Sequence, residues 1–100
     1  MIARMWHGTT PLHKADEYQR LMREIAIPDY LATEGNISAF VLRRDEGGMA
    51  HFTTLTFWRS LDAIKAFAGE DAAVAKYYNF DPDFLVELVP HAEHYEAFDK

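Results

Sequence analysis

The sequence contains no cysteine among its 100 residues. This absence excludes disulfide bonds, thiolate catalysis and cysteine-ligated zinc, and it fits a cytoplasmic protein. Basic residues are also scarce: 10 Lys and Arg stand against 16 Asp and Glu, which gives a formal net charge of −6. Surfaces that bind nucleic acid or anionic membranes need clustered Lys and Arg to replace counter-ions, so we expect neither partner.

Long apolar runs are missing as well. No stretch approaches the roughly 20 residues that cross a bilayer, and the segment from Met1 to Trp6 lacks a run of signal-peptide length, so we expect a cytoplasmic location. Apolar residues still make up 49% of the chain and aromatic residues 14%. This content favours a packed core over disorder, and the length indicates one domain over 1–100.

The order of hydrophobic periods predicts β-α-β-β-α-β, the split βαβ pattern of ferredoxin-like α+β domains. Such a domain has one antiparallel sheet with helices on one face. The expected segments are a strand at 2–9, a helix from Thr10-Pro11, strands at 37–44 and 51–58 around a turn at 45–48, a helix from Ser60 to Gly69, a helical stretch that opens at 70–71, runs through Ala75 and ends at 77–79, and a strand at 91–98. The stretch 84–89 is ambiguous between a helical turn and a strand.

Both helices are expected to be amphipathic and to begin at hydroxyl caps, Thr10 and Ser60. Pro28 removes a backbone donor and restricts the residue before it, so the first helix should break or kink there. The side chains expected to be buried are Ala15, Tyr18, Met22 and Ile25 in the first helix and Leu61, Ile64 and Phe67 in the second.

The strand at 51–58 carries large side chains on both of its faces. One face holds Phe52, Thr54, Thr56 and Trp58, and the other holds His51, Thr53, Leu55 and Phe57. A sheet covered on one side only should alternate more cleanly between apolar and polar residues. We therefore expect a second copy of the chain to cover the other face, which predicts a homodimer.

Three segments resemble the antibiotic biosynthesis monooxygenase group of dimeric α+β barrels: 1–8, 55–64 and 93–96. The most recognisable part is a strand that ends in Trp58-Arg59-Ser60 and leads into an apolar helix, a pattern that specifies fold better than activity. The resemblance spans essentially the whole chain. It implies a dimer whose two sheets pack face to face, and a pocket in each subunit between the sheet and its helices.

The resemblance also implies a choice of chemistry. Some relatives oxidise phenolic or quinol compounds without metal, flavin or any other cofactor, and others degrade heme. The heme-degrading relatives use an asparagine on the first strand, a tryptophan on the helix after the Trp-x-Ser strand and a histidine on the next helical segment. Trp6, Phe67 and Tyr77 occupy those places in this chain. Heme degradation is therefore not expected.

In polyketide-oxidising relatives, Asn, Trp, Tyr and Arg side chains surround a phenolic substrate. This chain offers Trp58, Tyr77 or Tyr78, and Arg4, but no asparagine at an expected strand position, because Asn36 and Asn79 lie at segment ends. The match in residue type is partial. It indicates a small cofactor-independent monooxygenase that acts on an aromatic, phenolic or quinol-like molecule.

Histidine is the natural base for ionising a phenol, because its pKa lies near neutrality. His7 and His94 lie in the first and last expected strands, which are usually neighbours in this fold, so a shared site is one hypothesis; the alternative is that each is a partly exposed strand residue. Tyr77 is the third catalytic candidate. His91 and His94 are three residues apart, which places them on opposite faces of a strand, so no metal site is expected.

The candidate substrate-binding residues are aromatic, with one exception. They are Trp6, Trp58, Phe67, Tyr78 and Arg4. Rings of this kind suit a flat conjugated ligand by stacking, although they also suit an ordinary core. Arg4 is expected to share a strand face with Trp6, and a guanidinium there needs a carboxylate such as Glu93 or Glu96, or else an anionic ligand.

Two functions therefore remain open. The first is the monooxygenase described above. The second is a non-catalytic dimeric module that binds a small apolar ligand or stabilises an assembly. An oxygenase needs a cavity with a histidine or tyrosine hydroxyl inside it, whereas a structural module would fill that space with Trp6, Phe67 and Leu61.

Overall fold

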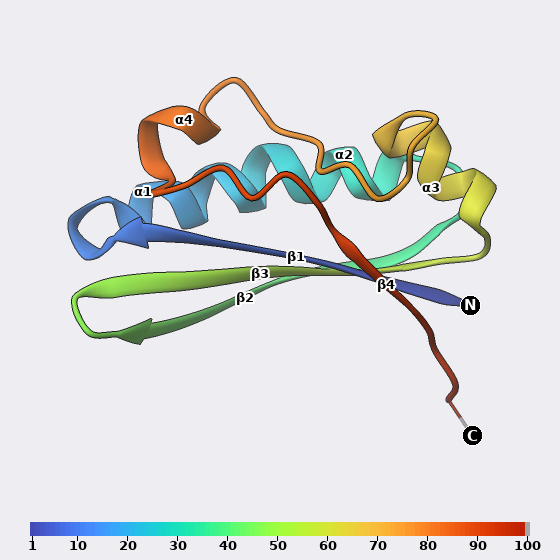
Figure 1. Cartoon of the computed structure of the whole chain (residues 1–100), viewed down its shortest axis with the longest axis horizontal. Helices are drawn as coiled ribbons and strands as arrows, with labels where there is room; N and C mark the ends of the chain where they lie inside the picture. Colours follow the sequence, from blue (N-terminus) through green and yellow to red (C-terminus); the bar gives the residue numbers. More distant parts are fainter. Residues whose placement is uncertain (100) are drawn as a thin grey trace.

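The computed structural model describes residues 1–99. In chain order its elements are β1 (Ile2–Pro11), α1 (Leu12–Leu21), the π-helical turn η1 (Met22–Ala26), α2 (Ile27–Ala32), β2 (Asn36–Glu46), β3 (Met49–Trp58), α3 (Leu61–Ala68), α4 (Asp81–Phe84) and β4 (Glu93–Glu96). The helices lie over one side of the sheet (Figure 1). The expected α+β architecture is confirmed.

The four strands form one antiparallel sheet in the order β2-β3-β1-β4. β1 is central, with Ile2 opposite Trp58 on β3 and opposite Glu96 on β4. This order is that of a split βαβ domain, because the first and last strands are neighbours. β1 runs to Pro11, two residues beyond the expected end, and β4 is shorter than expected.

The hairpin between β2 and β3 turns over Gly47-Gly48, with Glu46 opposite Met49. The two glycines have φ angles of 62° and 78°. A two-residue turn that matches the strand twist needs positive φ at both central positions, which glycine adopts without steric cost. The turn is thus shorter than the expected segment 45–48, and Asp45 and Glu46 belong to the strand.

The first helical region does not break at Pro28. The N–H of Ile27 donates to the carbonyl of Met22, five residues earlier, so the helix widens before α2 begins. This wider turn leaves Pro28 in the first turn of α2, where a missing N–H is tolerated. The extra residue also shifts the buried stripe, so Ala26 is buried while Ile25, expected inside, is 43% exposed.

The predicted helix caps and the predicted buried residues of α3 are confirmed only in part. Ser60 accepts a hydrogen bond from the N–H of Ala63 at 3.2 Å and caps α3 as predicted. Thr10 instead lies inside β1, fully buried, and α1 begins without a side-chain cap. In α3, Ile64 and Phe67 are buried as expected, but Leu61 is 45% exposed.

The segment 70–75 is not helical, which is a second correction. Its backbone pairs instead with the approach to β4: the N–H of Ala75 donates to Pro90 at 2.9 Å, and the N–H of Ala92 donates to Ala73 at 2.8 Å. A helix does form at 81–84, where Asp81-Pro82 was expected only to end one. Proline at the start of a helix lacks only an N–H that would be unsatisfied anyway.

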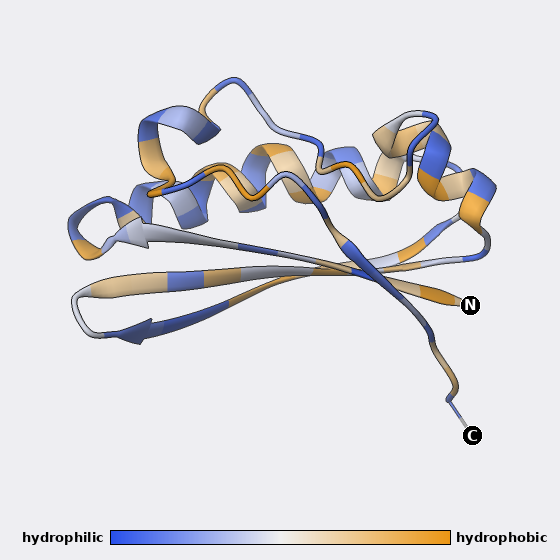
Figure 2. Cartoon of the chain, viewed as in Figure 1, coloured by the Kyte–Doolittle hydropathy of each residue, from blue (hydrophilic) through white to orange (hydrophobic). Residues whose placement is uncertain are grey.

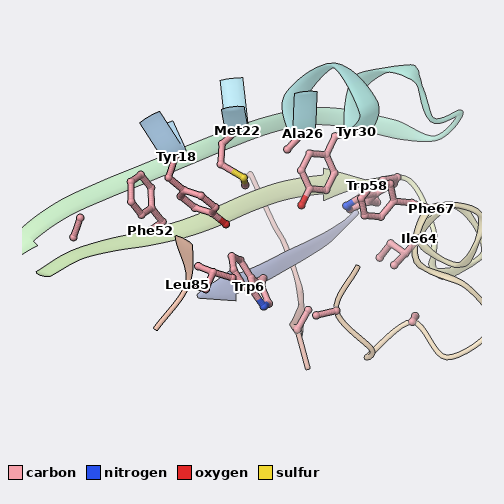
Figure 3. Close-up of a cluster of buried hydrophobic side chains, with 14 of the residues drawn as sticks. Trp6, Tyr18, Met22, Ala26, Tyr30, Phe52, Trp58, Ile64, Phe67 and Leu85 are labelled. Atoms are coloured by element: carbon pink, nitrogen blue, oxygen red, sulfur yellow. The ribbon is translucent and has the colours of Figure 1, made fainter. Parts of the chain in front are cut away.

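The core lies between the sheet and the helices (Figures 2 and 3). Tyr18, Phe52, Trp58 and Ile64 are fully buried there. The opposite face of the sheet is only partly buried, and it exposes large apolar groups, with Phe40 at 50% and Tyr95 at 51%. The predicted division of the β3 side chains between two faces is therefore confirmed, and no helix within 1–99 covers the second, partly apolar face. None of the helices within 1–99 has the length and apolar character to cross a membrane.

Candidate functional site

Arg4 lies on the helix-covered face of β1 and is 2% exposed. Its Nη2 donates to the carbonyl of Val74 at 3.1 Å, and its Cζ lies 5.7 Å from the centre of the Phe67 ring. The Nε is buried and has no hydrogen-bond partner among the residues that the structure describes. Burial lowers the pKa of the guanidinium, and the nearby Tyr30 and Tyr78 act in the opposite direction.

The prediction that Glu93 or Glu96 pairs with Arg4 is wrong. Glu93 is opposite Met5, so it points away from the helices, and Glu96 is opposite Ile2 at the end of the sheet. No carboxylate within residues 1–99 forms an ion pair with Arg4. The guanidinium is therefore a buried positive charge that the described part of the chain does not neutralise.

His94 is directly opposite Arg4 in the pairing of β1 with β4. The two side chains consequently share the helix-covered face, and cross-strand neighbours of this kind lie about 5 Å apart at Cβ. The Nε2 of His94 is buried, and no described residue forms a hydrogen bond with it. Burial, followed by the charge of Arg4, lowers the pKa of His94, so the imidazole is neutral at pH 7.

His7 lies on the other face of the sheet. It is exposed, stacks on His51 with ring centres 5.6 Å apart, and has its Nδ1 3.4 Å from the Thr53 hydroxyl. The hypothesis that His7 and His94 share a site is therefore wrong. The reason is the two-residue period of a strand: His94 is opposite Arg4, and His7 is three residues from Arg4.

Aromatic rings surround the guanidinium on the helix side. Phe67 stacks on Tyr30 with centres 4.5 Å apart and packs against Trp58 at 5.6 Å. The Nζ of Lys76 lies 4.4 Å from the centre of the Phe67 ring. Two cations, Arg4 and Lys76, thus approach one aromatic ring.

The carboxylate of Asp29 on α2 binds the segment that covers this region. It accepts from the Tyr78 hydroxyl at 2.7 Å and pairs with Lys76 at 2.8 Å. Desolvation opposes the ionisation of Asp29, but the hydrogen bonds from Lys76 and Tyr78 outweigh it and lower its pKa. Burial and the same carboxylate raise the pKa of Tyr78. Tyr78 is thus a donor to Asp29 at neutral pH.

Tyr77 and Trp6 lie together further along β1. Their rings meet edge to face at 6.3 Å, and both donate to the carbonyl of Val89, Trp6 at 3.1 Å. Burial raises the pKa of the Tyr77 hydroxyl, and the charge of Asp81 acts in the same direction. These contacts support a positioning role for Tyr77 more than a role as a base.

Asp81 is a buried polar residue that the sequence analysis missed. It is 2% exposed and accepts from the Tyr18 hydroxyl at 2.9 Å and from the N–H of Tyr78 at 2.6 Å. Burial raises its pKa, against the effect of both hydrogen bonds. Its place before Pro82 indicated only a break in a helix, and no local signal showed that it would be buried.

Two further expectations concern an asparagine in a strand and a group of metal ligands. Asn36 is the first residue of β2, contrary to the expectation that no asparagine occupies a strand, and its Oδ1 is buried without a partner. The described residues contain no group of three His, Asp or Glu side chains suited to a metal ion. His91 is exposed and lies outside β4.

Comparison with known proteins gives a likeness of structure only. No family model matches the chain, and no curated protein sequence matches it. A solved structure from Nitrosomonas europaea, named as a candidate antibiotic biosynthesis monooxygenase, superposes with a TM-score of 0.74 at 12% identity and covers 97% of this chain and 98% of its own.

Two further solved structures cover almost the whole chain. Rv0793 from Mycobacterium tuberculosis has a TM-score of 0.62 at 19% identity, with 99% of this chain and 96% of its own covered. A protein from Bacillus cereus, also named as a candidate antibiotic biosynthesis monooxygenase, has a TM-score of 0.57 at 16% identity, with 99% and 94% covered. The chain therefore has the fold of proteins named for the antibiotic biosynthesis monooxygenases, the group that its sequence resembles.

Proposed function

We propose that the chain is a small cofactor-independent monooxygenase that oxidises a phenolic or quinol-like molecule on the helix-covered face of the sheet. The observation that carries this proposal is the buried guanidinium of Arg4, which has no carboxylate partner within residues 1–99 and lies beside a neutral imidazole. The likeness to structures named as monooxygenases supports the same reading.

In this mechanism His94 accepts the proton of the phenol, and Arg4 stabilises the phenolate. The ionised ring transfers an electron to oxygen, and the resulting superoxide joins the ring radical as a peroxide. Loss of water then leaves a quinone, so one oxygen atom enters the ring and the other leaves as water. The substrate supplies all four electrons. Trp6, Phe67 and Tyr77 hold the ring in place.

The proposal includes a homodimer. The apolar sheet face opposite the helices is suited to packing against the same face of a second copy, because large side chains on its strands are exposed to different degrees. Phe40, Leu42 and Tyr95 are about half exposed, and Leu55 and Phe57 on β3 are partly buried. Sedimentation at micromolar concentration should give a dimer, and Phe57→Lys should give a folded monomer. A wild-type monomer would refute this part of the proposal.

Oxygen uptake by the metal-stripped protein with a panel of hydroquinones tests the activity. We expect uptake above the buffer control, strongly reduced in His94→Ala. His7→Ala is the matched control, because His7 lies on the other face of the sheet, and it should keep wild-type activity. Uptake that equals the buffer control for every compound would remove the enzymatic proposal.

One observation favours the alternative, a non-catalytic dimeric module. Trp6 is 8% exposed, Phe67 is 6% exposed and Trp58 is fully buried, so these rings fill much of the space between the sheet and the helices. Leu61, the third side chain expected to fill it, is exposed. A module of this kind would give no uptake with any hydroquinone and would still form the dimer.

A further inference from the structure

The buried charge of Arg4 is costly to the folded protein. An uncompensated charge in a protein interior destabilises the fold by several kcal/mol even after relaxation. Within the described part of the chain, Arg4 has one hydrogen bond, to the Val74 carbonyl, and its Nε has no partner. A neutral residue such as methionine would fill the same volume without this cost. The guanidinium is therefore explained better by a ligand than by the needs of the fold.

His94 supplies a second unpartnered group on the same face. Its Nε2 is buried, and it is adjacent to Arg4 across the strands. A neutral imidazole next to a cation has no reason to bind a proton, but an anion placed between the two groups would favour protonation. Arg4 and His94 together thus offer donors to one negatively charged group.

The Val74 carbonyl accepts a hydrogen bond from Nη2 of Arg4, so one donor of the guanidinium is already used. This carbonyl belongs to the segment 71–78, which contains no helix. The contacts of this segment with the rest of the chain include the bridge of Val74 with His91, backbone hydrogen bonds to residues 90 and 92, and the bonds to Asp29. Arg4 is 2% exposed, so a ligand reaches it only after this segment moves. A ligand oxygen would then replace the carbonyl oxygen at Nη2.

We propose that Arg4 and His94 bind the carboxylate of a small aromatic acid, with the segment 71–78 as its cover. A guanidinium presents parallel N–H bonds that match the two oxygens of a carboxylate, and a single cation suits a single negative charge. The Phe67 ring lies beside the guanidinium and stacks on Tyr30, with Lys76 also near it, so the ring of the acid would have to pack against this cluster once the segment has moved. A dianion such as phosphate would find too few donors here.

This inference rests on the proposed function only in using the same two side chains: the carboxylate would occupy the position of the phenolate, so the aromatic acid is a competing ligand and not the substrate. Benzoate is the probe, and benzamide is its neutral counterpart of the same shape. Calorimetry should show that benzoate binds and benzamide does not. Nuclear magnetic resonance should show that benzoate raises the pKa of the His94 ring, while His7 on the opposite face keeps its value and serves as the internal control.

Arg4→Met should weaken benzoate binding about 10- to 100-fold, because hydrogen bonds to a charged group are lost. Arg4→Lys keeps the charge but lacks the parallel N–H donors of the guanidinium, so it should cause an intermediate loss of benzoate affinity. Arg23→Met, at an exposed position on η1, is the matched control and should bind benzoate like the wild type. Urea unfolding of each variant shows that it is folded.

Three results would overturn the inference: benzoate does not bind, benzamide binds equally well, or Arg4→Met binds benzoate like the wild type. Binding of phenol in preference to benzoate would overturn the choice of carboxylate. The outcome is separable from that of the activity assay. Benzoate binding without hydroquinone oxidation refutes the proposed function alone, and oxidation without benzoate binding refutes this inference alone.

Discussion

Replacement of Arg4 by methionine should stabilise the protein in the absence of ligand. The substitution keeps an unbranched side chain of similar length, which fills the same space beside Phe67, and it removes a charge that no carboxylate within 1–99 neutralises. A site built to bind an anion should be destabilising while empty, because its charge is buried without a partner.

The magnitude follows from three opposing effects. Removal of an uncompensated buried charge contributes about 3–5 kcal/mol of stability. The lost hydrogen bond leaves the Val74 carbonyl without its donor, which costs about 1–3 kcal/mol. The lost contact between the guanidinium and the Phe67 ring costs about 1 kcal/mol. The balance is a gain of about 1 kcal/mol, which corresponds to a rise in Tm of about 4–8 °C for a domain of this size.

Equilibrium urea unfolding at one fixed protein concentration measures this gain, as a higher midpoint with an unchanged dependence on denaturant. Arg59→Met, at an exposed position, is the control and should change stability by less than about 0.5 kcal/mol. A loss of about 1 kcal/mol or more in Arg4→Met would refute the reasoning. The guanidinium would then serve the fold, through its bond to Val74.

Three further predictions concern Tyr18, Gly35 and His94. Tyr18→Phe should destabilise the protein by about 1–3 kcal/mol in thermal unfolding, because it removes a donor to the buried carboxyl of Asp81. Gly35→Ala should cost more than about 1 kcal/mol in the same assay, because Gly35 has a φ of 91° and an added Cβ would lie 2.4 Å from that of Ala63. The lowered pKa of His94 predicts that stability is complete above the unfolded-state pKa of about 6.5 and is lost as the pH falls from there toward the folded-state pKa; His94→Gln should reduce this acid-side loss in urea unfolding at several pH values.

Each of these predictions has a control within the chain. Tyr95→Phe removes an exposed hydroxyl and should change stability little. Gly47→Ala meets no neighbouring atom, so it should cost less than Gly35→Ala although both have positive φ. His7→Gln should leave the pH dependence as in the wild type. A Tyr18→Phe variant as stable as Tyr95→Phe, equal losses in the two glycine variants, or a wild-type pH profile in His94→Gln would contradict the corresponding prediction.

The sequence by itself determined the features that depend on near neighbours. The two-residue period of 51–58 predicted which side chains of β3 share a face, and Ser60 and Gly69 predicted the two ends of α3. The three-part resemblance predicted the fold that the solved structures share. These features follow from backbone geometry, capping and turn chemistry, all of which act within a few residues.

Only the tertiary structure decided the rest. The π turn keeps Pro28 inside a helix and places Ala26 in the core instead of Ile25. The packing of the buried helix face thus outweighs the local tendency of proline to end a helix. The segment 70–75 pairs its backbone with residues 90–92 instead of coiling, and this pairing joins parts of the chain that are distant in sequence.

The site depends on the same kind of long-range contact. Its polar groups are Arg4 and His94 from the two ends of the chain, and the pairing of β1 with β4 places them on one face while it leaves His7 on the other. No period within a single strand fixes that register. The sequence shows that Arg4 and His94 are present. Their burial and their contacts, and therefore their chemistry, depend on the pairing of β1 with β4.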